Sequence, residues 1–461
     1  MDHRRLVQPR RVRMRSSARP TLTAAEVSAG TPSTRKRYVD LLRVVSIAVV
    51  VVGHWTMAVL GFEDGRFTGR NLLEIAPWTH VLTWVFQVMP VFFIVGGFTN
   101  AASWRSASER GETYGGWLRG RSVRLLGPAL VFVAFWTVLP MLAVAVALPS
   151  GVARTGGREV ALPIWFLAVY LGSMAAIPVL VAAHRRFGIG LLGALVGAAA
   201  AVDVARYGFG VPFVGTLNYA FVWLAILELG LLWRDGTLTR RSPTPWVLAG
   251  GGLVALGLLT QFVDYPVSMI GLTHAERSNT LPPTLALVAL GVWQCGAVLI
   301  LEGAANRWLE RPRVWLRVVV ANSMVMTFYL WNMTAAVLAA VLLLPTGVWP
   351  DAEPLSAAWW WLRLLWIAAC AICLIPFLLG FRWAERSPRV SADPYRPPAA
   401  LALLGVVLAC TGMGIVAAEA FPVQGEDPLV PSIGVACMVA GALVLRVNPI
   451  APLRRHRDAV A

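Results

Sequence analysis

An apolar stretch that runs from Arg37 to Leu60 carries two ionisable side chains, Arg43 and His54. Its length suits a helix that crosses the hydrocarbon core of a membrane, which takes about 20 residues. Arg43 and His54 are 11 residues apart. At about 100° and 1.5 Å per residue, both side chains point from one face of the helix, about 16 Å apart along its axis. Because ionisable groups are costly in lipid, this face is expected to meet a bundle interior or a wet cavity.

Each of the two residues also has an ordinary explanation. Arg43 alone is explained by a long side chain that extends to the polar boundary of the membrane. His54 alone is explained as a hydrogen-bonded histidine of the core. Two ionisable groups on one stripe of the same span favour a functional site instead, because lipid penalises both of them.

The composition identifies the class of protein. Of the 461 residues, 57% are hydrophobic and only 14% are charged, and the mean hydropathy is +0.66. These values are typical of a polytopic membrane protein and exclude an ordinary soluble domain. In a soluble protein the net charge of +16 would suggest a nucleic-acid partner. Here most basic residues fall in loops of one sidedness, so no nucleic acid is expected. All five cysteines lie in apolar segments, so neither disulfides nor a metal site are predicted.

Runs of about 20 apolar residues predict the transmembrane helices. Twelve such runs occur, at 39–60, 79–102, 125–148, 163–183, 187–205, 211–233, 246–264, 281–302, 318–345, 358–381, 398–421 and 429–447. The predicted fold class is therefore an all-α polytopic membrane protein of about 12 transmembrane helices, with a ten-helix core and two additional C-terminal helices.

The basic residues give the orientation of these helices. With twelve spans, 32 of the 40 basic residues fall on the side of the N-terminus and 6 on the opposite side. Loops rich in arginine and lysine stay in the cytoplasm. We therefore expect a multi-pass protein of the plasma membrane with both termini cytoplasmic.

The chain divides into five predicted parts. They are a basic disordered cytoplasmic tail at 1–37, a membrane core at 38–385, a linker at 386–397, two further transmembrane helices within 398–447, and a basic cytoplasmic tail at 448–461. The linker is predicted from its polar, proline-rich sequence, SPRVSADPYRPP.

A second basic feature precedes the third span, in the loop sequence WLRGRSVRLLGP. Arg121 and Arg124 are three residues apart, so they share a face if the helix begins early, with Arg119 alongside. Guanidinium groups at this spacing suit phosphate oxygens. The alternative is an anchor that touches lipid headgroups. Together with Arg43, which also lies near the cytoplasmic boundary, the pair favours a polyanionic cofactor.

Three further polar residues lie inside predicted spans. Asn332 is about 20 Å into the ninth span, a depth that matches that of His54, although an asparagine in a span also commonly joins helices. Glu228 in the sixth span and Gln87 in the second are candidates to pair with Arg43 or His54. The sequence alone leaves open which pairs form.

Several motifs resemble the acyltransferase-3 family of integral membrane acyltransferases, in a form common in actinobacteria. They are Asp40-Leu-Leu-Arg43 followed by ten residues and His54, Phe92-Phe93 through Gly96-Gly97-Phe98, Arg121-Ser-Val-Arg124, Trp165-Phe166-Leu167, Asn279-Thr280-Leu281-Pro282-Pro283, and Tyr329-Leu330-Trp331. The resemblance covers about 35–385.

The resemblance implies an enzyme that takes an acyl group from cytoplasmic acyl-CoA to a hydroxyl of a cell-envelope carbohydrate, lipid or related acceptor. It implies that His54 is catalytic and that Arg43, Arg121 and Arg124 handle the donor. As a general base, His54 suits an acceptor hydroxyl. Arg43 is the second catalytic candidate, and it would stabilise either the thioester oxyanion or the donor phosphates. Members of the family often carry histidine where this chain has Asn332, and asparagine does not titrate near neutral pH.

Two other functions compete with this interpretation. A twelve-span proton-coupled secondary transporter would use His54 and Glu228 as a proton relay. Its two six-span halves, however, lack matching interrupted helices. A non-catalytic membrane scaffold is the third possibility. The acceptor, the acyl chain and the oligomeric state stay open.

Overall fold

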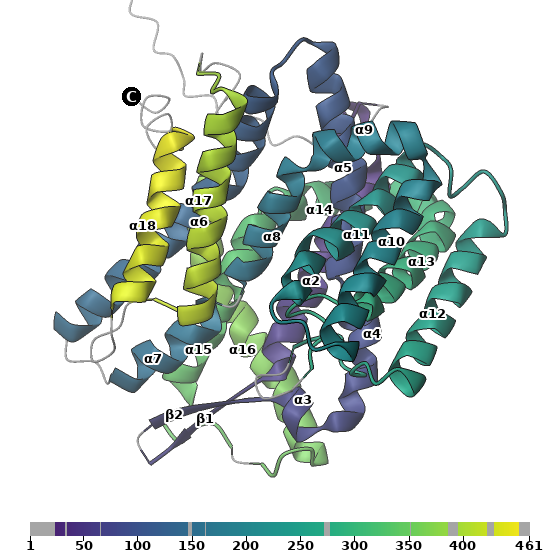
Figure 1. Cartoon of the computed structure of the whole chain (residues 1–461). Coiled ribbons are helices and arrows are strands. Elements are labelled where there is room, and N and C mark those ends of the chain that lie inside the picture. Colours follow the sequence, from purple (N-terminus) through teal and green to yellow (C-terminus); the bar gives the residue numbers. More distant parts are fainter. Residues whose placement is uncertain are drawn as a thin grey trace, which may run out of the picture.

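The structure is a computed structural model that describes residues 24–32, 35–64, 66–145, 150–161, 163–271, 277–350, 352–385, 395–421 and 428–450. It is a bundle of helices with one small hairpin at one end (Figure 1). Strands β1 (Ala58–Glu63) and β2 (Arg66–Asn71) form this hairpin and pair antiparallel.

The elements follow one another along the chain with short connections. The helices are α1 (Ala24–Ala29), α2 (Arg37–Met57), α3 (Leu72–Ile75), α4 (Thr83–Phe86), α5 (Met89–Glu109), α6 (Tyr114–Ala145), α7 (Ser150–Ala161), α8 (Ile164–Ala175), α9 (Ile177–Phe187), α10 (Ile189–Asp203), α11 (Asn218–Arg234), α12 (Thr244–Phe262), α13 (Leu285–Leu309), α14 (Pro312–Asn322), α15 (Val325–Leu343), α16 (Ala357–Phe381), α17 (Ala399–Glu419) and α18 (Leu429–Val444). Short segments extend or join them, namely the 3₁₀ helices η1 (Pro77–Leu82), η3 (Val214–Leu217) and η4 (Arg382–Glu385) and the π-helical segment η2 (Val204–Gly208).

Within the described chain, ten helical segments are long and apolar enough to cross a membrane. They correspond to ten of the twelve predicted spans. The predicted span 163–183 corresponds to a pair of segments, Gly156–Ala175 and Ile177–Phe187, bent by 53°. The predicted span 429–447 corresponds to the shorter helix α18. The prediction of an all-α polytopic membrane fold is therefore confirmed.

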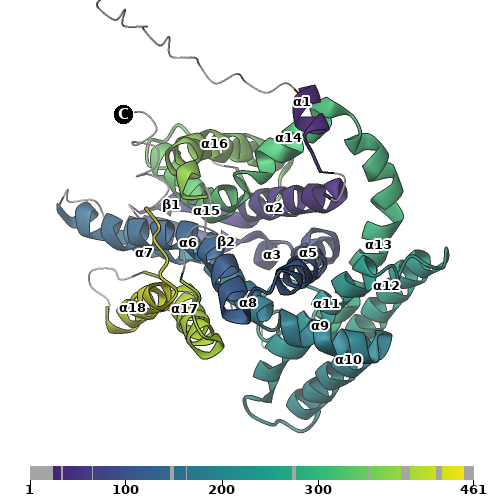
Figure 2. The ribbon, with the colours of Figure 1, turned by 90° about the horizontal axis from the view of Figure 1, so that it is seen from above.

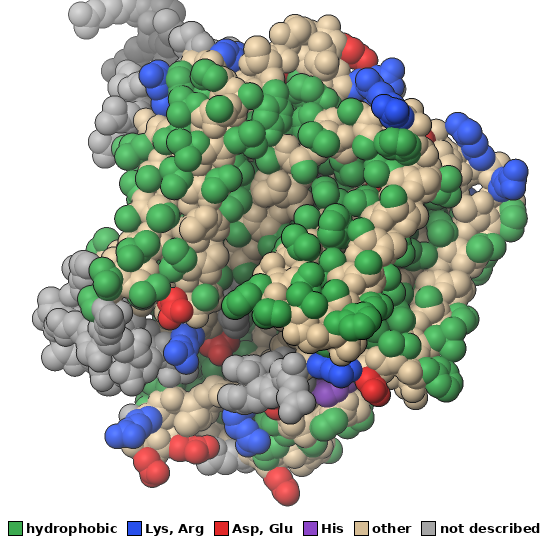
Figure 3. Space-filling view, viewed as in Figure 1, with side chains coloured by type: hydrophobic (Ala, Val, Ile, Leu, Met, Phe, Trp, Pro, Cys, Tyr) green, Lys and Arg blue, Asp and Glu red, His purple; other side chains and the backbone are tan. Residues whose placement is uncertain are grey.

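The surface has the layering that a membrane requires. On the face shown in Figure 3, hydrophobic side chains form a broad band, and most charged side chains lie above and below it. Helix α2 begins at Arg37 at one end of the bundle, and the end that contains it is called here the arginine end. The β1–β2 hairpin follows α2 at the other end, called here the hairpin end (Figure 1).

Close contact between α5 and α11 fixes the centre of the bundle. A Cβ atom added at Gly97 of α5 would collide with the backbone of Leu227, and one added at Gly230 of α11 would collide with the backbone of Ile94. Only glycine allows the two backbones to approach in this way. The contact places the residues that follow Gly97 against the middle of the bundle.

Several predicted boundaries are wrong. The first span was predicted to reach residue 60, but α2 ends at Met57 and the next residues form β1. The ninth was predicted to begin at residue 318, but 318–322 belong to α14 and the long helix α15 begins at Val325. Glu385 explains this start, because its carboxylate accepts hydrogen bonds from the backbone N–H groups of Met326 (2.7 Å) and Thr327 (3.1 Å). A carboxylate there caps the helix and stabilises its positive end.

The predicted tails and linker are described only in part. Residues 1–23, 386–394 and 451–461 lie outside the described residues. Within the stretch expected to be disordered, Ala24–Ala29 form α1, which packs against α14. Nearby, Trp315 donates a hydrogen bond to the Thr31 hydroxyl (2.8 Å). Order therefore extends into the predicted tail.

The last two helices pack on the side of the core, against α8 and α6 (Figure 2). Arg119 fastens them at the arginine end. Its side chain, only 3% exposed, donates to the carbonyl of Leu445 (2.8 Å) and lies over the ring of Tyr395 (5.1 Å). Arg119 is thus engaged in packing, unlike its neighbour Arg124, which is exposed.

Candidate active site

His54 and Asn332 meet inside the bundle, although 278 residues separate them in sequence. Nδ1 of His54 lies 3.0 Å from the side-chain oxygen of Asn332. The Asn332 amide nitrogen donates to the carbonyl of Tyr329, so its oxygen is the atom turned toward the imidazole. The indole N–H of Trp55 donates a hydrogen bond to the backbone carbonyl of Asn332 at 2.8 Å. One completely buried asparagine therefore holds two consecutive side chains of α2.

The partner decides which nitrogen of His54 carries the proton. An amide oxygen only accepts hydrogen bonds, so Nδ1 must be the protonated nitrogen in the neutral imidazole. The lone pair then lies on Nε2, which has no hydrogen-bond partner in the described part of the chain. A histidine held in this tautomer is arranged to accept a proton at Nε2.

The arginines gather nearer the arginine end, where a dipeptide of α5 joins them. Arg43 donates to the hydroxyl of Thr99 (2.9 Å), and Arg121 donates to the side-chain oxygen of Asn100. Asn100 in turn donates to the hydroxyl of Tyr170 (3.1 Å). Because Thr99 and Asn100 are consecutive, α5 sets the positions of guanidinium groups from both α2 and α6.

This arginine cluster, defined as Arg43, Arg121 and Arg124, has an excess of positive charge. The positive charges of Arg43 and Arg124 are close enough to Arg121 to repel its guanidinium group. The carboxylate near Arg43 is that of Asp40 at 3.7 Å, which is shared with Arg35 at 2.7 Å. Arg124 has neither a hydrogen bond nor an ion pair with any described residue. Such a cluster attracts anions, and guanidinium groups suit phosphate oxygens in particular.

Helix α2 links the two parts of the site. Arg43 and His54 lie on one face of it, about 16 Å apart along the axis. The prediction of a common face required that both residues lie on one unbroken helix, and α2 is unbroken between them. The early start of α6 at Tyr114 also places Arg121 and Arg124 on one helix rather than in a loop.

Glu228 and Gln87 do not pair with Arg43 or His54 in the described structure, contrary to what the sequence suggested. Glu228 lies 2.5 Å from Nδ1 of His184, whose Nε2 lies 3.0 Å from Asp235. Gln87 instead donates to the carbonyl of Met269 (3.1 Å). Its own carbonyl accepts from Gln294 (2.9 Å). These hydrogen bonds of Gln87 therefore stabilise the non-helical connection between α4 and α5.

Sequence reasoning missed Thr99, Asn100, Tyr170 and His184. The sequence did contain one signal of close helix contact here, the glycine at position 96. In the structure, a Cβ atom at Gly96 would lie 2.9 Å from the Tyr170 ring. The pair Gly96-Gly97 therefore marks close approach of two neighbouring helices, α8 and α11, to α5. His184 lies beside two arginines in the sequence, which gave no sign that it contacts a buried carboxylate.

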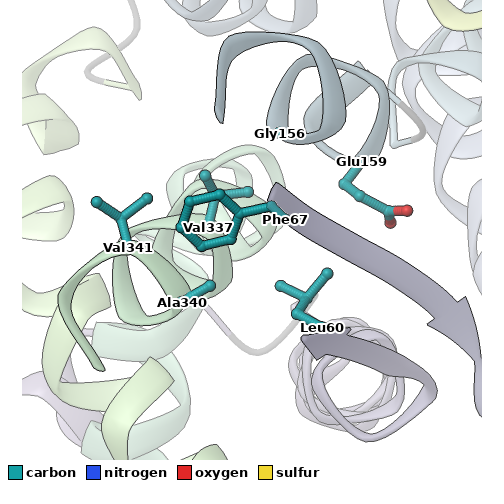
Figure 4. A pocket seen from close by; sticks show the side chains of 7 residues that line it. All are labelled: Leu60, Phe67, Gly156, Glu159, Val337, Ala340 and Val341. Atoms are coloured by element: carbon teal, nitrogen blue, oxygen red, sulfur yellow. The ribbon is translucent and has the colours of Figure 1, made fainter. Parts of the chain in front are cut away.

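Two hollows of the structure lie away from this site. A pocket of about 20 Å³ is lined by Leu60 and Phe67 of the hairpin, Glu159 of α7 and Val337 of α15 (Figure 4), and its volume suits a single water molecule. A wider apolar groove of about 370 Å³ lies between α8, α11 and α17. Neither hollow contains the arginines or His54. In the described residues, no group of three His, Cys, Asp or Glu side chains is placed to hold a metal ion.

The family comparison agrees with this geometry. The model of a family described as an acyltransferase domain matches residues 36–378, well over half of the chain. No curated protein and no solved structure matches the chain. The matched region contains α2, α5, α6 and α15, the helices that supply the arginine cluster and the His54–Asn332 pair. The chain therefore belongs to the acyltransferase-3 family and is a membrane acyltransferase.

Proposed function

We propose that the protein transfers an acyl group from acyl-CoA to a hydroxyl of a cell-envelope carbohydrate, lipid or related acceptor. The observation that carries this proposal is the arrangement on α2, where Arg43 of the cationic cluster and the oriented His54 share one helix face. Acyl-CoA has phosphates at one end and a thioester at the end of an extended arm. A donor of this shape fits a phosphate site and a base about 16 Å apart.

The arginine cluster would hold the donor. Arg121 is positioned by Asn100, and Arg124 is exposed and unpaired in the described structure. Both are free to donate to phosphate oxygens, with charge-assisted hydrogen bonds. Arg43 shares α2 with His54 but lies about 16 Å from it along the axis, so we assign it to the donor phosphate at the start of the extended arm.

His54 would carry out the proton transfers. Its Nε2 takes the proton of the acceptor hydroxyl as the hydroxyl oxygen forms a bond to the thioester carbon. The tetrahedral intermediate then collapses, the C–S bond breaks, and the imidazolium returns the proton to the leaving sulfur. Asn332 remains a hydrogen-bond acceptor for Nδ1–H throughout and holds the ring in place.

The proposed orientation follows from the basic residues. The side of the membrane to which 32 arginine and lysine residues are assigned is the side of the arginine end. By the positive-inside rule that end faces the cytoplasm, where acyl-CoA is found, and both termini lie there. His54 lies near the opposite end of α2, four residues before Ala58. With this orientation, the transfer step would lie toward the outer half of the membrane, next to an acceptor of the envelope.

The transporter interpretation loses its main support. It required His54 and Glu228 to relay protons, but His54 contacts the non-titrating Asn332 and Glu228 contacts His184. These two pairs lie on different helices of the bundle, and no described hydrogen bond joins them.

Direct binding of CoA to the purified protein tests the donor assignment. Wild-type protein should bind CoA, and the double variant Arg121→Gln/Arg124→Gln should bind it roughly two to four orders of magnitude more weakly, because each charge-assisted hydrogen bond contributes about 1.5–3 kcal/mol. Arg240→Gln is a matched control, since Arg240 is also exposed but lies in the loop between α11 and α12. If folded wild-type protein binds no CoA at millimolar concentration, the acyl-CoA assignment is wrong.

A further inference from the structure

Arg363 is a buried arginine near the hairpin end that the mechanism above does not use. It lies on the buried face of α16 and is 9% exposed. One nitrogen of its guanidinium donates to the carbonyl of Ala58 at 2.9 Å, and the group lies over the ring of Trp359 at 4.3 Å. Ala58 follows the last residue of α2, and its own N–H donates to the carbonyl of His54. Arg363 is therefore attached to the end of the helix that carries His54.

Hydrogen bonding leaves Arg363 with unused donors. A guanidinium has several N–H groups, and the bond to Ala58 uses one of them. No described carboxylate forms an ion pair with Arg363, and no further partner is present in the described part of the chain. A partner for a carbonyl need not be charged. A buried cation without a counter-ion is costly at the depth of a membrane. A neutral donor could bind the Ala58 carbonyl and hold the end of α2, so this contact alone does not explain an arginine here.

Trp366 provides a second, independent sign of a missing acceptor. Its side chain is 3% exposed, yet its indole nitrogen has no hydrogen-bond partner. A buried N–H without a partner costs free energy as well. Trp366 lies three residues after Arg363 on the same buried face. Side chains of a helix lean toward its N-terminus, so the indole leans toward the turn that carries Arg363.

All of the unused groups at this place are donors. Arg363 and Trp366 offer N–H groups and a positive charge, and neither offers an acceptor. The complementary ligand is an oxyanion, and a guanidinium binds a phosphoryl group especially well. We propose that Arg363 and Trp366 form a subsite that binds a phosphoryl group of the acceptor at the hairpin end. Only the word acceptor in this proposal rests on the proposed function, because the binding of phosphate by these residues does not involve acyl-CoA.

The phosphoryl group has two possible sources, the headgroup of an anionic lipid or a phosphate outside the lipid. We would measure the thermal unfolding midpoint of the purified protein in dodecyl maltoside, which lacks phosphate, with ionic strength held constant by chloride. One series adds inorganic phosphate and the other adds phosphatidic acid. A ligand that binds the folded state raises the midpoint, and the concentration dependence gives its apparent Kd.

For wild-type protein we expect stabilisation by phosphatidic acid, by inorganic phosphate, or by both. Stabilisation by phosphatidic acid alone identifies a lipid headgroup, and stabilisation by inorganic phosphate shows that a phosphate outside the lipid reaches the site. Because the arginine cluster is also proposed to bind phosphate, the test is the difference between wild type and variants that keep this cluster. Arg363→Gln should raise the apparent Kd about tenfold or more, and Trp366→Phe should raise it severalfold.

Two variants keep the test decisive. Trp366→Phe removes the N–H group with part of the indole and keeps an aromatic ring against Trp349, which packs on Trp366 with centroids 5.8 Å apart. If Arg363→Gln does not fold, Arg363→Lys takes its place, because it keeps the positive charge. Arg363→Lys alone should weaken binding less than the double variant Arg363→Lys/Trp366→Phe. Arg277→Gln is the control at the same end and should leave the apparent Kd unchanged. Equal apparent Kd values in wild type and in the folded Arg363 and Trp366 variants would overturn the proposal, whatever the outcome of the CoA experiment.

Discussion

The side-chain oxygen of Asn332 lies 3.0 Å from Nδ1 of His54. This contact gives a physical meaning to the position where members of the family often carry histidine. Asparagine cannot pass a proton on, but it fixes the tautomer of His54 and leaves Nε2 as the basic atom. The known enzyme constellation of cysteine, histidine and asparagine uses an amide in a comparable position beside its histidine. The site can therefore perform base catalysis with one titrating group.

Replacement of His54 should remove the chemical step while donor binding persists. In His54→Ala we expect kcat to fall by about 10²–10⁴-fold, the usual contribution of a general base. The apparent Kd for CoA should change little, because the arginine cluster is intact. Turnover and CoA binding measured on the same folded sample check this. Near-normal turnover in a well-expressed variant would contradict the catalytic assignment.

Asn332 should act on the rate through His54. Asn332→Leu removes the acceptor for Nδ1–H, so the imidazole loses its fixed orientation, and kcat should fall by roughly 10- to 100-fold. Asn332→Asp keeps an acceptor at the same place and should lose less. The pH profile of kcat separates this role from a packing role, since only a positioning residue should shift the profile. Equal rates in the Leu and Asp variants, with unchanged pH profiles, would show that the contact is structural.

Asn100 should matter for the donor rather than for the chemical step. It is completely buried and links Arg121 to Tyr170. In Asn100→Ala, Arg121 loses its positioning partner, and the apparent KM for the donor should rise about tenfold. Saturating donor should restore kcat. A loss of kcat that saturating donor does not rescue would place Asn100 closer to the reacting atoms than we infer.

The features that were predicted correctly depend on one helix at a time. The common face of Arg43 and His54 follows from helical geometry, which the sequence contains in full. Contacts between helices depend on which faces meet, and apolar periodicity inside a membrane says little about that. Glu228 illustrates the difference, because the close packing of α5 on α11 leaves it facing α9, where it meets His184. Thr99 and Asn100 were overlooked for the same reason.

The broken ninth span has a different cause. The run 318–345 is predominantly apolar despite Asn322 and Ser323, so hydropathy predicts one continuous helix. The chain instead ends α14 at Asn322 and restarts at Val325, where Glu385 caps the new helix from a position 59 residues after Met326. Such a long-range cap leaves no local signal in the sequence. Asn332 consequently lies only seven residues into α15, about 10 Å along its axis, yet it still reaches His54.

The Glu385 cap should therefore stabilise the helix that carries Asn332. Its carboxylate also accepts a hydrogen bond from the Thr327 hydroxyl at 2.7 Å. Glu385→Ala leaves these donors without a partner and should lower the free energy of unfolding by about 0.5–2 kcal/mol, the range for a helix cap. Glu385→Gln keeps one acceptor oxygen and should lose less. Unfolding of the purified protein in mixed micelles measures both. Equal stability of Glu385→Ala and wild type would show that the cap contributes nothing.

The orientation of the bundle decides whether the donor site can meet cytoplasmic acyl-CoA at all. Glu353 is exposed at the hairpin end, and Ser242 is exposed at the arginine end, between α11 and α12. After the five native cysteines are replaced, Glu353→Cys should react in whole cells with a thiol reagent that does not cross the membrane, and Ser242→Cys should react only after the cells are opened. Both variants need the same labelling in opened cells as a control for accessibility. The reverse pattern would place the arginine cluster outside the cytoplasm, away from acyl-CoA. The acyl-CoA proposal would then fail, whereas the geometry of His54 and Asn332 would still support base catalysis with a donor from the other side.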